Sequence, residues 1–112
     1  MQVNWKEEFS VAITVCDKKG IILEMNEKSV SSFAKDGGRQ LIGKNLFDCH
    51  NPESVIKIKK LMNDNKTNVY TIEKNGVHKL IYQSPWFEKG ELKGLVEFTV
   101  EIPSDLPHHV RS

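Results

Sequence analysis

The sequence predicts an α+β domain: a sheet of five antiparallel strands, with short helices and one longer helix packed on one face. Strand-rich stretches at residues 11–25 and 67–102 flank a helical middle. Two tight-turn signals, Asn75-Gly76 and Lys89-Gly90, divide the second stretch into three strands. Strands grouped at both ends of a chain, with helices between them, are typical of this class.

Length and composition limit the possible functions. The chain has 112 residues, of which 38% are hydrophobic and 28% charged, and its net charge is +1. These values suit one globular domain, and the absence of a basic stripe argues against nucleic-acid binding. No apolar run reaches the roughly 20 residues of a membrane span, and the N-terminus does not resemble a signal peptide. Two distant cysteines make no disulfide framework, so we expect a cytoplasmic protein.

Residues 1–9 are expected to form a separate N-terminal segment. Trp5 and Phe9 are four positions apart, which fits one amphipathic helical turn that would cap a dimer. The two rings could be buried against the domain itself or against a second copy of the chain, and their spacing does not choose between these.

The first strands and the first helix follow directly. Residues 11–17 and 21–25 are rich in β-branched and apolar side chains, and the turn at 17–20 joins them as a hairpin. Asn26 suits the cap of a helix over 26–35, because its side-chain oxygen can accept a backbone N–H. Asp36-Gly37-Gly38 then ends this helix.

The longer helix is predicted to begin at Pro52. Asn51 suits its cap, and proline at the first helical position loses no hydrogen bond. An apolar stripe of Val55, Ile58 and Met62 faces the core, and residues 63–65 end the helix.

The closing strands are predicted at 67–74, 77–87 and 91–102. In the last strand the apolar side chains alternate with polar ones, so one face should be buried and the other wet. The expected buried set is Val96, Phe98, Val100 and Ile102, and the expected wet set is Glu97, Thr99 and Glu101. The domain thus covers 10–103, and 104–112 form a polar tail.

Three stretches carry a family resemblance. They are V-C-D-K-K-G-I-I-L-E-M-N-E (15–27), L-I-G-K-N (41–45) and G-L-V-E-F-T-V-E-I (94–102). In this order and spacing they resemble the PAS domain, a small sensor module, and the D-C-H-x-P step at 48–52 looks like a bacterial subgroup of it. The resemblance implies a sheet that cups a ligand or an apolar core against the helices, frequent homodimers, and an effector such as a kinase as partner.

We therefore expect a sensory signalling module, not an enzyme, that binds a small ligand or a protein partner and signals through dimerisation. One alternative is a haem-binding redox or gas sensor with His50 as the axial ligand. Another is a purely structural dimerisation domain. Flavin photochemistry is disfavoured, because Leu46 stands where light-sensing flavin PAS domains carry a cysteine.

The candidate ligand-binding residues are Phe33, Leu46, Cys49, His50, Ile58, Met62, Ile72, Tyr82, Gln83 and Phe98. For most of them plain core packing is the competing interpretation. The candidate dimer-interface residues are Trp5, Phe9 and Trp86. We expect no catalytic residue, because the adjacent Cys49 and His50 lack a third orienting group. No zinc-ligand spacing is present, so His50 would bind a metal only as a haem ligand.

Overall fold

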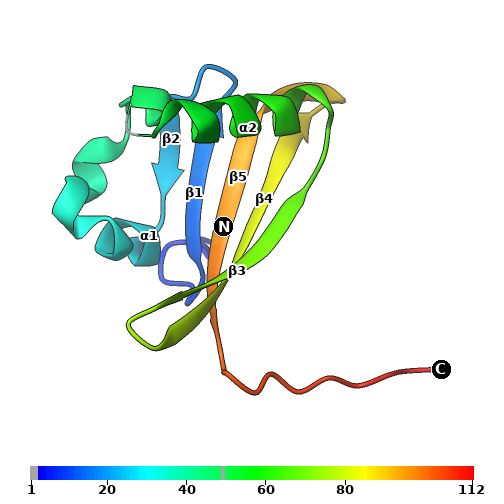
Figure 1. The fold of residues 1–112 in the computed structure, drawn as a ribbon. Coiled ribbons are helices and arrows are strands. Elements are labelled where there is room, and N and C mark those ends of the chain that lie inside the picture. Colours follow the sequence, from blue (N-terminus) through cyan, green and yellow to red (C-terminus); the bar gives the residue numbers. More distant parts are fainter. Residues whose placement is uncertain (1–2, 49) are drawn as a thin grey trace.

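The computed structural model describes residues 3–48 and 50–112. Its elements are β1 (Ala12–Asp17), β2 (Ile22–Met25), α1 (Glu27–Ser32), the short 3₁₀ helices η1 (Ala34–Asp36), η2 (Gly38–Leu41) and η3 (Leu46–Asp48), α2 (Pro52–Asn63), β3 (Asn68–Lys74), β4 (Val77–Glu88) and β5 (Glu91–Ile102). The strands form one antiparallel sheet in the order β2-β1-β5-β4-β3. Figure 1 shows α2 lying across this sheet and α1 beside β2. The predicted α+β fold is confirmed.

The turn between β1 and β2 is held by one carboxylate. Asp17 Oδ1 accepts hydrogen bonds from the backbone N–H groups of Lys19 (2.9 Å) and Ile21 (3.0 Å). Gly20 has a φ of +87°, and a Cβ added there would lie 2.7 Å from the Phe47 ring. Glycine therefore meets two needs at this position: a left-handed backbone and room for η3 to pack against the hairpin.

Both helices begin where the sequence predicts. Asn26 caps α1 by accepting from Ser29 N, and Asn51 caps α2 by accepting from Ser54 N. Pro52 occupies the first turn of α2. The α2 residues Ile58 and Met62 are buried against Cys16 and Leu95 of the sheet. The helix is thus anchored over β1 and β5.

The predicted burial of β5 is wrong, because the faces of the strand are exchanged. Glu97 pairs with Gln83 of β4 and Thr14 of β1, so these three side chains share one face. That face also carries Cys16 and Leu95, which α2 covers. Val96, Phe98 and Val100 therefore point to the opposite face, where they are only half-buried.

A β-bulge accounts for this exchange. Beside the Lys89-Gly90 turn, Phe87 pairs with Leu92, but the next pair is Trp86 with Gly94. Lys93 is the extra residue, and it shifts the register of everything beyond it by one position. A shift of one residue moves every following side chain of the strand to the other face. The alternation was therefore predicted correctly, but the face that the helices cover was not.

The N-terminal segment does not form the predicted helical turn within its described residues. Phe9 N donates to Lys6 O over 3.3 Å in a single turn, and α1 uses the neighbouring carbonyls: Asn26 Nδ2 donates to Lys6 O and Glu27 N donates to Glu7 O. These carbonyls are fixed by the domain instead of by a helix of their own. Trp5 and Phe9 meet edge to face with their ring centroids 5.5 Å apart.

At the other end, residues 106–112 are exposed and have no regular secondary structure. Figure 1 shows this tail leading away from the sheet. Among the described residues, no helix combines the length and apolar character needed to cross a membrane.

Candidate functional site

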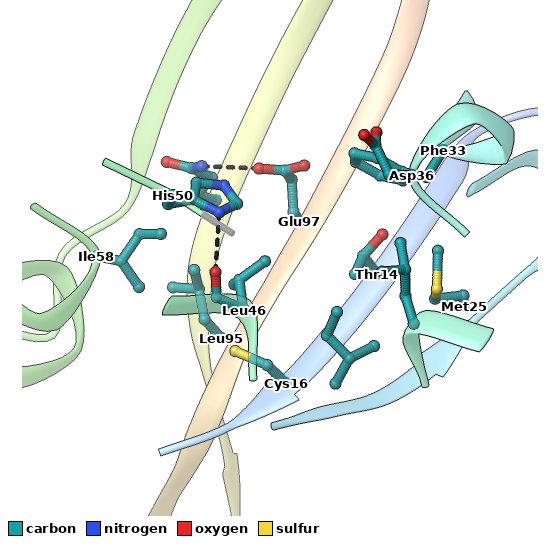
Figure 2. A pocket seen from close by; sticks show the side chains of 13 residues that line it. Thr14, Cys16, Met25, Phe33, Asp36, Leu46, His50, Ile58, Leu95 and Glu97 are labelled. Carbon is teal, nitrogen blue, oxygen red and sulfur yellow. Dashed lines mark hydrogen bonds between the residues drawn. The ribbon is translucent and has the colours of Figure 1, made fainter. Parts of the chain in front are cut away.

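A cavity of about 410 Å³ lies between the sheet and the helical segments. Figure 2 shows the side chains that converge on it. Its apolar lining residues are Cys16, Ile22, Met25, Phe33, Leu41, Leu46, Ile58 and Leu95, and its polar ones are Thr14, Asp36, His50, Gln83 and Glu97. A mostly apolar wall with a few convergent polar groups is the usual make-up of a small-molecule site.

The sheet supplies the polar floor of the cavity. Thr14, Gln83 and Glu97 come from three neighbouring strands, and the register places them side by side. The β2 residues, the 3₁₀ turns and Ile58 of α2 supply the apolar walls. The bulge beside Gly94 thus turns the Glu97 carboxylate into the cavity.

A chain of side-chain hydrogen bonds crosses this floor. Asn68 Nδ2 donates to Gln83 Oε1 over 3.0 Å, and Gln83 Nε2 donates to Glu97 Oε2 over 2.8 Å. Gln83 is only 8% exposed, and both ends of its amide are used. Because Gln83 is held from both sides, it fixes the position of the Glu97 carboxylate.

His50 lies at the rim of the cavity. Its Nδ1 is 3.0 Å from the carbonyl oxygen of Leu46. A carbonyl oxygen only accepts, so Nδ1 carries the hydrogen, and in the neutral ring Nε2 is left as an acceptor. This hydrogen bond ties the His50 ring to the backbone just before α2.

Cys16 is buried in the cavity wall and is a poor nucleophile. Burial raises the pKa of its thiol; a backbone hydrogen bond from Leu95 lowers this pKa, and the charges of Asp17 and Glu97 raise it. A protonated thiol neither attacks an electrophile nor binds a metal readily. In the described part of the chain no three His, Cys, Asp or Glu side chains gather to hold a metal ion.

The structure brings together half of the predicted ligand-binding residues. Phe33, Leu46, His50, Ile58 and Gln83 line the cavity. Met62 is instead buried in the core cluster around Ile58 and Leu95. Cys49 lies outside the described residues.

Three of the predicted residues lie away from the cavity. Tyr82 and Phe98 are paired on the opposite face of the sheet, with ring centroids 6.3 Å apart. Ile72 shares the face of the cavity but is 39% exposed, because it lies on the β3–β4 hairpin. For Tyr82 and Phe98 the reason is the same as for the β5 prediction, because the register beyond the bulge turns them to the face opposite the cavity. Ile72 is on the correct face but lies too far along the hairpin to line the cavity.

The sequence prediction also missed lining residues, above all Thr14, Asp36 and Glu97. A recognised bulge would have revealed Glu97, since Gln83 was already a candidate and pairs with it. Asp36 follows the first helix in a glycine-containing turn, and its sequence neighbours give no sign of a cavity.

The predicted dimer residues differ in exposure. Trp5 and Phe9 are 56% and 46% exposed. Trp86 is only partly exposed, and its indole N–H donates to Cys16 O over 3.0 Å. Trp86 therefore contributes to the fold of the domain, whereas Trp5 and Phe9 leave apolar area open to solvent.

The lining residues do not fit a haem. His50 could offer Nε2 to an iron atom, but haem carries two propionate groups that need cationic or donor side chains near them. Among the described lining residues there are two carboxylates, Asp36 and Glu97, and no Lys or Arg. These charges would repel the propionates.

Comparison with known proteins identifies the family of folds to which the structure is similar. No family model and no curated protein matches the sequence, but many solved structures match the coordinates. The PAS domain of histidine kinase ThkA aligns with a TM-score of 0.64 and 20% identity, covering 80% of this chain and 97% of that one. The chain has the PAS fold.

Two further PAS structures agree. A PAS domain from Colwellia psychrerythraea aligns with a TM-score of 0.64 and 18% identity, covering 88% of this chain and 91% of that one. The Aer2 receptor of Vibrio cholerae, described as a dual PAS-haem oxygen sensor, aligns with a TM-score of 0.64 and 18% identity over 83% of this chain and 95% of that one. Similarity at this identity concerns the PAS fold and not the ligand.

Proposed function

We propose that this PAS-fold chain is a sensory module that binds a small ligand in its cavity and passes the signal on through a homodimer. The observation that carries the proposal is the cavity itself, about 410 Å³ within a domain of 112 residues. Ligand sites usually measure about 300–1,000 Å³. A void of this size is costly for a small core unless something fills it.

The alternatives have less support. A purely structural dimerisation domain gives no reason for a cavity floored by Gln83 and Glu97. The haem alternative conflicts with the two carboxylates in the lining. An enzymatic role would need an activated nucleophile or base, and the raised pKa of Cys16 does not supply one.

The signal would pass to a partner through apolar surface that the domain leaves exposed to solvent. Trp5 and Phe9 are one such surface, and the sheet face of Tyr82 and Phe98 is another. Exposed aromatic groups of this kind are typical of interfaces. The proposed partner is a second copy of the chain, and an effector such as a kinase would respond to the geometry of the dimer in the cytoplasm. Ligand binding would favour one dimer geometry by population shift.

Native mass spectrometry of the freshly purified protein tests ligand binding. We expect an extra mass that denaturation removes. Leu46→Trp should fill part of the cavity and abolish this mass. The matched control is Leu23→Trp, the same substitution at a 43% exposed position of β2 outside the lining. The proposal would be contradicted if the purified protein retained no extra mass and the two variants bound added ligands equally well.

A further inference from the structure

We infer that the cavity selects a ligand with an apolar body and a cationic, hydrogen-bond-donating nitrogen, such as a protonated amine. The inference rests on the proposed ligand-binding function and adds the chemical class of the ligand. It follows from which polar atoms of the lining already have hydrogen-bond partners in the protein and which remain open to a ligand.

The polar side chains of the lining already use hydrogen-bond donors within the protein. Gln83 Nε2 donates to Glu97 Oε2, His50 Nδ1 donates to Leu46 O, and the hydroxyl of Thr14 pairs with that of Ser29. Ser29 is fully buried, so the Thr14 hydroxyl is held against the protein interior by this pair. A carboxylate or phosphate ligand would find few donors here and would face the carboxylates of Asp36 and Glu97.

Most of the open polar atoms are acceptors. Glu97 Oε1 has no hydrogen-bond partner among the described residues, and neither Asp36 nor Glu97 takes part in any ion pair there. Nε2 of neutral His50 is also an acceptor. Figure 2 shows the Glu97 carboxylate between His50 and Asp36 in its view of the cavity. Three acceptor groups, two of them negatively charged, thus border one mostly apolar space.

Chemical complementarity then gives the ligand class. A carboxylate beside an apolar wall attracts a positive charge more strongly than it does in bulk water, because the wall lowers the local dielectric constant. A protonated amine also carries the N–H donors that these acceptors lack. The apolar walls favour a ligand with a hydrophobic body, and the cavity volume is large enough for about two fused rings.

Three indole probes that differ in one terminal group test the inference: tryptamine, tryptophol and indole-3-acetate. Each is titrated into the full chain, and binding is measured by calorimetry and by amide chemical shifts of Cys16, Leu46 and Leu95. We expect tryptamine to bind about tenfold or more tightly than tryptophol, since a charge-assisted hydrogen bond has about this effect. Indole-3-acetate should bind most weakly.

Glu97→Gln keeps an oxygen for Gln83 Nε2 and removes only the charge. It should reduce the preference for tryptamine over tryptophol about tenfold, and urea unfolding shows whether the variant is folded. The control is Glu101→Gln, on the same strand and face but outside the lining; it should behave like the unchanged protein. Equal binding of the three probes, or preference for indole-3-acetate, would overturn the amine class while leaving the cavity as a ligand site. Binding of none of them would contradict both proposals.

Discussion

Asn26 Oδ1 accepts a hydrogen bond from the backbone N–H of Ile13 over 2.9 Å, and so joins the start of α1 to strand β1. The same oxygen accepts from Ser29 N over 3.0 Å. Its amide nitrogen donates to Lys6 O and Val11 O over 2.9 and 2.8 Å. One buried side chain thus ties the N-terminal segment, the sheet and the wall of the cavity together.

Replacing Asn26 should therefore destabilise the protein more than the loss of an ordinary helix cap. We expect Asn26→Ala to lower the free energy of unfolding by about 3 kcal/mol, because buried backbone groups lose their partners. Asn51→Ala removes a similar cap at the exposed start of α2 and should cost about 1 kcal/mol. Urea unfolding measures both, and equal losses would contradict the tying role of Asn26.

Gly94 should tolerate no side chain. A Cβ there would lie 1.9 Å from the carbonyl oxygen of Cys16, which also accepts from Trp86. We expect Gly94→Ala to lower the free energy of unfolding by about 3 kcal/mol or more and to shift the fluorescence of Trp86 as its hydrogen bond breaks. The control Gly76→Ala has open space around its Cβ and a φ of +78°, so it should cost only about 1–2 kcal/mol of backbone strain. A mild effect at Gly94 would argue against the bulge and the register beyond it.

The proposed dimer predicts which exposed aromatic groups matter. We expect Trp5→Ala or Tyr82→Ala to raise the dimer dissociation constant about tenfold or more, as truncation of an interface aromatic commonly does. Sedimentation equilibrium measures this. Ile56→Ala is the control, because Ile56 is 66% exposed on α2 and should have no effect. A monomer at every concentration would remove the dimer from the proposed function.

Cys16 should make stability depend on pH in the alkaline range. Burial raises the pKa of its thiol in the folded state, so as the pH rises past about 8.5 the unfolded chain loses the thiol proton first. The unfolded state then binds fewer protons, and the free energy of unfolding falls. With Cys49 replaced by Ser in both proteins, the loss between about pH 7 and pH 9.5 should be larger with Cys16 than with Cys16→Ala. Identical pH profiles would contradict a raised pKa.

The elements of this fold could be predicted from the sequence because their signals are local. Asn51 and Pro52 mark the start of α2, and Asn75-Gly76 marks a hairpin, each through the chemistry of one or two residues. The PAS fold follows from the order of such signals. Five of the predicted ligand-binding residues line the cavity, and one of them, Ile58, lies on the apolar stripe that helical spacing predicts for α2.

The main errors came from two features that the local sequence pattern does not reveal. The extra residue at the β4–β5 bulge determines whether Glu97 or Phe98 faces the helices. The sequence around Lys93 contains no signal that predicts the bulge. The N-terminal helix was mispredicted for a related reason, because Asn26 and Glu27 use the carbonyls of Lys6 and Glu7. In both cases backbone pairing with a neighbouring segment outweighs the local pattern.

The central claim is that an apolar, ligand-sized space lies between α2 and the sheet. Methyl NMR of ligand-free protein, refolded from urea and placed under xenon, tests it most directly, because xenon enters apolar cavities without needing a specific partner. We predict the largest shifts at the methyl groups of Leu46, Ile58 and Leu95, and none at the exposed Leu23 and Ile56. Shifts that are absent, or equally large at the exposed methyl groups, would contradict the account.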